Sequence, residues 1–560
     1  MAAKVKGFLK DNRRPICLVI GFLFLSLFLM PTSIIHGYMN WWDTNAMLTM
    51  GKALLHGLVP FKDLFEQRGP YMYFLMALAN LISPKTPFYG VYVLELIQMA
   101  FMSYLLFRIY RRFASKRASD WLVFFSLIFL LECPPYFQGG SPEVFSLLSL
   151  TYLLYLVFLF SDKRLSNWQL IIAGMMFGYL IWLKYALIGA FVGFYLVIGF
   201  RELKKKHFLE FMRLVAYSLI GVFLITLPVL LYFYFNQALG ILFHDYFVVN
   251  LGYGSMSDGI LLKLLYVFYL QATIFFSYNL LIVLFIPVMV LIWRAYHKKY
   301  RKICFSLFFI IMISMIGNYY AGINGLSYDL PFMYLMIPLC LLSAYQLFAC
   351  RRSAPKVFKD VMRAWILMII VLPLILSGSI LLHRRYLERV INLPVQIETL
   401  GYQNPKKAVY GQIGLYIKKH GKGKLVDLNV VDNGFYLASG QLPRTRYWEQ
   451  TMLAYGAVPS LTYGQYRQVA KKIPKYIVDG YMGTITEQTQ RASVYPQDYK
   501  IWKFFYDGHY HSQIVPKALL KYYRPVVYSK LNILYPLQKT DDYDKHMNNR
   551  FYYILFVRKD

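Results

Sequence analysis

Residues 15–35 read PICLVIGFLFLSLFLMPTSII, an apolar run that directly follows a cluster of cationic side chains. As an α-helix, these 21 residues are long enough to cross a bilayer core of about 30 Å. No small-residue cleavage site follows the run, so we expect a retained transmembrane helix and not a signal peptide. The preceding cations are Lys4, Lys6, Lys10, Arg13 and Arg14.

Ten further apolar runs predict a polytopic α-helical membrane protein with about 11 transmembrane helices. The chain has 560 residues, of which 58% are hydrophobic and only 16% are charged. This composition excludes a disordered chain and a small disulfide scaffold. The further runs lie at about 88–107, 121–135, 144–160, 169–185, 187–200, 214–235, 279–296, 303–323, 331–350 and 364–382.

The cations between these runs show which way the protein points. Of 60 lysines and arginines, 27 lie at the N-terminus or in alternate connections, and the positive-inside rule places them in the cytoplasm. The intervening outer loops carry only Lys52, Lys62, Arg68 and Lys85. This assignment requires that segments 71–83 and 263–278 lie as helices at the outer interface instead of spanning. The scatter of the cations also excludes a nucleic-acid binder, despite a net charge of +32.

The sequence changes character after the last apolar run, which predicts two domains. We expect a transmembrane module over residues 1–383 and an extracytoplasmic α/β domain over residues 384–560. This tail is basic, with 27 lysines and arginines against 13 aspartates and glutamates. Its pattern predicts helices at 406–420 and 461–472 and strands at 424–431, 475–478 and 551–557.

The first outer loop is the richest in candidate site residues. Asp43 follows two tryptophans just after the first span, and an amphipathic helix is expected at 44–56. The loop continues as VPFKDLFEQRGP over residues 59–70. Charged groups near lipid are costly and therefore often functional. For Asp43 the structural alternative is an N-cap of the helix that follows it.

This loop resembles that of the GT-C glycosyltransferases that use polyprenyl-phosphate sugars, near the protein O-mannosyltransferase and aminoarabinose transferase branch (glycosyltransferase family 39-like). The similar features are Asp43 after the first span, a helix ending at Gly57, the motif Pro60-Phe61-Lys62-Asp63, and Arg68 shortly before a proline. Weaker similarities are Gly139–Glu143, Lys184, Ser327–Pro331, and residues 439–447, which look like the outer domain of Gram-positive members.

The resemblance implies an inverting transfer of a monosaccharide from a polyprenyl phosphate, undecaprenyl in type, to a cell-envelope acceptor such as a teichoic acid or surface polysaccharide. The reaction would occur on the outer face of a bacterial cytoplasmic membrane, with a donor synthase and a flippase acting upstream. Asp43 would be the general base, and Arg68 and Lys184 would bind the lipid phosphate. Glu143, Asp63 and Glu66 would orient the loop, and Glu143 could hold a divalent metal. Possible substrate contacts are Tyr328, Asp329, His244, Arg446 and Tyr447.

Other interpretations remain open at this stage. Lys184 could extend toward lipid headgroups, Glu143 could be a plain helix N-terminal carboxylate, and the pair His244-Asp245 could be structural. A lipid-linked sugar flippase or other transporter would need polar residues inside the spans, where Glu95, Gln98 and Glu132 are the main ones. A glycan polymerase or ligase would differ by using a diphosphate-linked donor.

Overall fold

The computed structural model describes thirteen stretches of the chain, which fall into two compact units. The helix unit comprises Met1–Ile35, Tyr92–Val229 and Met256–Gln396, and the sheet unit comprises His36–Val91, Leu230–Ser255 and Ile397–Asp560. The described residues within them are 13–36, 42–131, 139–161, 163–251, 298–316, 332, 335–350, 409–428, 431–449, 459–481, 517–530, 533–536 and 552–559. The predicted domain boundary at 383/384 lies outside the described residues and stays a prediction.

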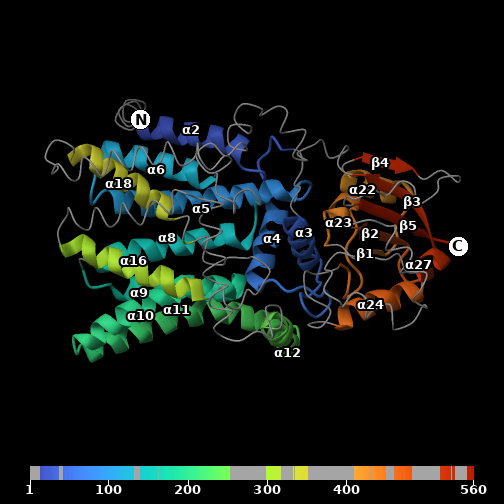
Figure 1. Ribbon diagram of the computed structural model, residues 1–560. Helices are drawn as coiled ribbons and strands as arrows, with labels where there is room; N and C mark the ends of the chain where they lie inside the picture. The colour runs from blue at the N-terminus through green and yellow to red at the C-terminus, as the bar shows by residue number, and fades with distance from the viewer. Residues whose placement is uncertain are drawn as a thin grey trace, which may run out of the picture. The chain divides into compact units, whose positions relative to one another are not determined.

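Helices occupy nine of the eleven predicted spans, and the spans at 279–296 and 364–382 lie outside the described residues. In Figure 1 the long helices of the helix unit run roughly alongside one another. They are α2 (Arg13–Leu29), α5 (Pro87–Tyr110), α6 (Lys116–Leu131), α8 (Pro142–Phe160), α9 (Asn167–Lys184), α10 (Gly189–Lys204), α11 (Phe208–Phe235), α16 (Lys298–Ile316) and α18 (Met336–Cys350).

Four helical stretches among the described residues are long and apolar enough to cross a membrane. They are Pro87–Tyr110, Pro142–Phe160, Asn167–Lys204 and Phe208–Phe235, the third of which joins α9 and α10 through the short 3-10 helix η1 (Tyr185–Ile188). The prediction of a helical membrane protein is confirmed, while the number of eleven spans stays a prediction.

Two Gly-x-x-x-Gly pairs explain the close packing of these helices. On α9, Gly174 and Gly178 face α11, where a Cβ at Gly174 would overlap the backbone of Ser218. On α10, Gly189 and Gly193 lie against α16 in the same way. Small residues at this spacing let two helix backbones approach, which is how helices associate in lipid, where burial of apolar surface gives little driving force.

Glu95 and Gln98, the two polar residues of α5 that the sequence marks, are both hydrogen-bonded within the helix unit. The Glu95 carboxylate, which is 1% exposed, accepts hydrogen bonds from the Thr32 hydroxyl at 2.5 Å and the Gly140 amide at 2.6 Å. Gln98 donates from Nε2 to the Val144 carbonyl at 2.7 Å. These contacts tie α5 to its neighbours and satisfy groups that would otherwise be costly in an apolar bundle.

The sheet unit contains a five-stranded mixed sheet of order β1-β2-β5-β3-β4 (Figure 1). β1 (Leu425–Leu428) and β2 (Tyr476–Tyr481) are parallel, with Leu425 opposite Tyr476. β5 (Tyr552–Arg558) joins β2 and β3 (Tyr523–Lys530) antiparallel, and β4 (Ile533–Pro536) pairs with β3. All four residues of β1 are buried, as expected for a strand covered on both faces. The α/β pattern predicted for the tail is therefore present.

The helices of the sheet unit come from distant parts of the sequence. The expected helices of the first outer loop are α3 (Trp42–Leu55) and α4 (Pro70–Ile82), and the backbone of Met76 leaves room only for a glycine at Gly51. The others are α12 (Leu239–Phe243), the π-helix η2 (His244–Val248), α13 (Val249–Leu251), α22 (Val409–Lys419), α23 (Phe435–Ser439), α24 (Pro459–Ala470) and α27 (Lys517–Tyr522).

Candidate functional site

A tightly bonded turn carries the chain from α3 toward Arg68. Gly57 ends the helix with a positive φ of 83°, a conformation that glycine adopts without strain. Phe61 also has a positive φ, 66°, although it is a bulky residue. Its ring is fully buried beside Tyr73 and Phe233, and this burial offsets the strain. The Asp63 carboxylate accepts a hydrogen bond from the Val59 amide at 2.7 Å, so Asp63 shapes this turn.

Arg68 joins two of the carboxylates that the sequence marks as candidates. Its guanidinium lies 2.5 Å from the Asp43 carboxylate and 2.8 Å from that of Glu66. Asp43 lies in the first turn of α3, after the position that an N-cap residue occupies. Its carboxylate is ion-paired with Arg68. Its side chain is 30% exposed, whereas that of Glu66 is 1% exposed. Asp43 is therefore the more solvent-accessible of these two carboxylates.

Further bonds fix Glu66, and with it Arg68. The Tyr73 hydroxyl donates to Glu66 at 2.8 Å, and the Gln67 amide donates to it at 2.9 Å. Burial acts to lower the pKa of Arg68, but Asp43, Glu66 and Glu449 raise that pKa well above its ordinary value. The guanidinium therefore keeps its charge although its side chain is only 12% exposed.

A segment of the C-terminal region, residues 446–449, holds the loop from the other side; we call it the frame segment. The Phe65 amide donates to the Arg446 carbonyl at 2.8 Å, and the Trp448 indole donates to the Phe65 carbonyl at 3.2 Å. The Asp427 amide of β1 donates to the Trp448 carbonyl at 2.8 Å. The frame segment therefore connects the loop of Arg68 to the edge of the sheet.

Three buried carboxyl groups at the frame segment are residues that the sequence did not single out: Glu449 belongs to the segment, and the backbone amides of Asp427 and Asp432 donate to it. Glu449, Asp432 and Asp427 are each at most 1% exposed. Burial, followed by the charge of Glu66, raises the pKa of Glu449 well above its ordinary value. Asp432 accepts hydrogen bonds from the Thr49 hydroxyl of α3 at 2.6 Å and from amides at the start of α23. The only available signal was the position of Glu449, two residues after the stretch noted for its resemblance.

Glu143 and Lys184 form a separate pair within the helix unit. Lys184 Nζ lies 2.6 Å from Glu143 Oε1, at the end of α9 and the start of α8 respectively. Their side chains are 30% and 21% exposed. The two cations that the sequence marks for phosphate binding, Arg68 and Lys184, thus each form an ion-paired group, one in each unit.

The expected substrate contacts of the third outer loop and the tail are engaged with one another. Arg446 pairs with Asp245 at 2.8 Å, and Asp245 also contacts the ring of His244 at 2.8 Å. Tyr447 packs on Phe65 with ring centroids 6.0 Å apart. These contacts brace the loop, while Tyr328 and Asp329 lie outside the described residues.

Among the described residues, no group of three or more His, Cys, Asp or Glu side chains is arranged to hold a metal ion. The acids of the two groups are neutralised by Arg68 and Lys184. The expectation that Glu143 holds a divalent metal therefore gains no support from its surroundings.

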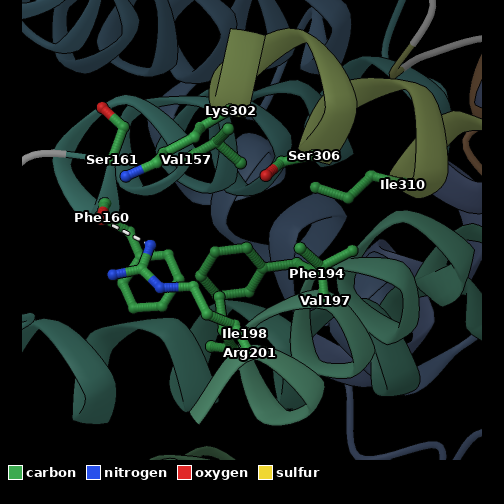
Figure 2. Close-up of a pocket in the computed structure, with 10 residues that line it drawn as sticks. All are labelled: Val157, Phe160, Ser161, Phe194, Val197, Ile198, Arg201, Lys302, Ser306 and Ile310. Carbon is green, nitrogen blue, oxygen red and sulfur yellow. Dashed lines mark hydrogen bonds between the residues drawn. The ribbon is translucent and has the colours of Figure 1, made fainter. Parts of the chain in front are cut away.

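A crevice of the helix unit between α8, α10 and α16 also contains cations, Arg201 and Lys302 (Figure 2). Its volume is about 10 Å³, room for about one water molecule. The Arg201 guanidinium lies 3.8 Å from the centroid of the Phe160 ring and donates to the Phe160 carbonyl at 3.1 Å. This crevice is a packing feature, since a phosphate does not fit into it.

The architecture is similar to that of solved structures of ArnT. ArnT from Cupriavidus metallidurans bound to undecaprenyl phosphate is 13% identical, and the match covers 87% of this chain and 95% of that chain with a TM-score of 0.51. For the apo state of ArnT, the identity is 12%, the coverage 88% and 95%, and the TM-score 0.52. The chain shares the GT-C fold of ArnT. The fold expected from the first outer loop is confirmed over most of the chain.

A further solved structure matches the chain with a lower TM-score. AglB from Archaeoglobus fulgidus, an oligosaccharyltransferase in complex with an inhibitory peptide and a dolichol-phosphate, is 11% identical, with coverage of 99% of this chain and 77% of that chain and a TM-score of 0.40. No protein-family model and no curated protein sequence matches the chain.

Proposed function

We propose that the protein is an inverting glycosyltransferase that moves a monosaccharide from a polyprenyl phosphate to a cell-envelope acceptor on the outer face of the membrane. The observation that carries this proposal is the 2.5 Å ion pair between Asp43 and Arg68. It combines a partly exposed carboxylate, suited to take a proton from a hydroxyl, with a cation that is 12% exposed and suited to an anionic leaving group.

The contacts of Arg68 indicate the role that each charged group would have in the reaction. Glu66 is fixed by Tyr73 and the Gln67 amide, so it stays on the guanidinium throughout. A lipid phosphate arriving at Arg68 competes only with the more exposed Asp43. The Asp43 carboxylate, released from the cation, then accepts the proton of an acceptor hydroxyl as that oxygen bonds to the anomeric carbon. The bond from the same carbon to the phosphate breaks, and the phosphate leaves with its charge neutralised by Arg68.

Undecaprenyl phosphate is the lipid we expect, and its support is the ArnT structure that contains this lipid. A bacterial cytoplasmic membrane, a cytoplasmic N-terminus and an outer C-terminal domain complete the proposal, as the distribution of cations predicts. A donor synthase and a flippase would supply the lipid-linked sugar. Transport is less favoured, because Glu95 and Gln98 of α5 are bonded to Thr32, Gly140 and Val144, while Glu132 lies outside the described residues.

Two steps test the proposal. The envelope glycans of strains with and without the protein are compared first, because the missing sugar names the donor to prepare. Transfer of that sugar is then measured in membranes that contain the wild type, Asp43→Asn or Asp120→Asn. Asp120 is a matched control, a carboxylate paired with Arg14 at 3.3 Å in the helix unit.

We expect Asp43→Asn to lose roughly 100- to 10,000-fold in transfer rate, the range for loss of a general base. The amide is neutral and cannot accept the proton, but it competes less for Arg68, so affinity for undecaprenyl phosphate should be equal or higher. Asp120→Asn should stay near the wild-type rate. Near-normal transfer by well-expressed Asp43→Asn would rule out its catalytic role.

A further inference from the structure

A second cavity, with a volume of about 500 Å³, opens within the sheet unit close to the turn that precedes Arg68. One wall is the end of α3 and the turn after it, with His56, Lys62 and Asp63. The other wall is residues 442–444, directly ahead of the frame segment, and includes Arg444. Leucine and proline side chains form the remaining surface. The cavity is large enough for one or two sugar units.

The turn holds its polar side chains in a fixed direction. The strained backbone of Phe61 is anchored by its buried ring, and the Phe61 amide donates to the Leu64 carbonyl at 2.8 Å. Lys62 donates from Nζ to the Asn236 carbonyl at 2.8 Å, and Asp63 is bonded to the Val59 amide. A bulky residue held at positive φ is a costly feature that persists only where the surroundings enforce it, and such strain gathers at binding sites.

The charges of the cavity favour an anion. Lys62 and Arg444 are both exposed, and they outnumber the one carboxylate, Asp63. His56, whose Nδ1 contacts the Lys52 carbonyl at 2.8 Å, is also exposed and adds a ring nitrogen that can bond to a hydroxyl. The combination of two cations, one carboxylate and an imidazole suits an anionic sugar chain, because it offers charge neutralisation together with hydrogen bonds to hydroxyl groups.

Both walls of the cavity continue along the chain into the segments that are bonded to each other next to Arg68. The segments that line it, 56–64 and 442–444, continue into the residues that bond to each other at Phe65 and Arg446. We propose that this cavity binds the anionic acceptor glycan, with Lys62 and Arg444 contacting a phosphate or carboxylate of the chain. This inference rests on the proposed glycosyl transfer and adds the place and the chemical class of its acceptor.

A binding experiment on the purified full-length protein tests the inference without any sugar donor. The probes are a glycerol-phosphate oligomer, an oligogalacturonate, and neutral maltotetraose as the uncharged control. The test variant carries Lys62→Gln with Arg444→Gln. The matched variant carries Lys419→Gln with Lys422→Gln, which removes the same charge from two exposed cations, one at the last residue of α22 and one shortly after it. Affinity for undecaprenyl phosphate is measured in parallel.

We expect the wild type and the matched variant to bind at least one anionic oligomer more tightly than maltotetraose. The Lys62/Arg444 variant should bind it about tenfold or more weakly, as expected when charge-assisted hydrogen bonds are lost. Its affinity for undecaprenyl phosphate should be unchanged. Equal oligomer binding by the test and matched variants, or no binding of either anion, would overturn the inference. Failure of the wild type to bind undecaprenyl phosphate would instead count against the proposed function.

Discussion

The two ion-paired groups differ in how firmly each cation is held. Arg68 contacts two carboxylates, is 12% exposed, and lies in a loop that is bonded to the frame segment. Lys184 is paired with Glu143, and its side chain is 30% exposed at the end of α9. A planar guanidinium presents several donors in a fixed fork, whereas an ammonium is a point charge on a flexible stem. We therefore expect Arg68 to bind a phosphate in one fixed orientation. We expect Lys184 to contact an anion through a side chain that can change its position.

The largest difference between the groups should appear when each cation is removed. Arg68→Gln should weaken undecaprenyl phosphate binding by roughly 10- to 100-fold, because charge-assisted bonds are lost. It also leaves Glu66 buried without its cation, which costs about 3–5 kcal/mol of unfolding free energy. Lys184→Gln should change the lipid affinity and the unfolding free energy much less, since water can hydrate the Glu143 carboxylate. Lipid titration and thermal unfolding of the purified proteins measure the two effects.

Arg68→Lys serves as the control for folding in that experiment. It retains the positive charge near Glu66 but not the fork that bonds to two carboxylates. We expect stability close to that of the wild type and an intermediate lipid affinity. If Lys184→Gln weakened lipid binding as much as Arg68→Gln, the distinction between a rigid and an adaptable cation would be wrong.

The first outer loop could be predicted as a site from the sequence, whereas the frame segment could not. Asp43, Arg68 and the helices around them were accessible from apolar runs, charge distribution and the local pattern of one loop. The frame segment was not, because Trp448 bonds to Phe65 and Glu449 acts on Arg68 through its charge, and these partners are almost 400 positions away in the chain. β3 was also missed, since Pro525 lies inside it and a β-bulge follows, which hides the alternation of a strand.

A smaller effect should show whether the frame segment acts on the site or only on stability. Trp448→Phe removes the indole donor to the Phe65 carbonyl, and Trp182→Phe removes the matching donor to the Thr226 hydroxyl in the helix unit, at 2.9 Å. Each change should cost about 1 kcal/mol of unfolding free energy. Only Trp448→Phe should also weaken undecaprenyl phosphate binding, by a few-fold. Equal lipid affinity in the two variants, at equal loss of stability, would reduce Trp448 to a purely structural role.

The smallest effect concerns the buried acids Asp427, Asp432 and Glu449 at the frame segment. Burial, then the charges of Asp432 and Glu449, raises the pKa of Asp427 well above its ordinary value. Between the unfolded value near about 3.9 and that raised pKa, the folded state binds more protons than the unfolded state, so stability falls as pH rises. Asp427→Asn removes this penalty. Its unfolding temperature should exceed that of the wild type by a few degrees at neutral pH and converge with it near pH 4. Thermal unfolding across this range, with Asp120→Asn as the control, measures the difference, and parallel curves for wild type and Asp427→Asn would show that Asp427 does not titrate in this window.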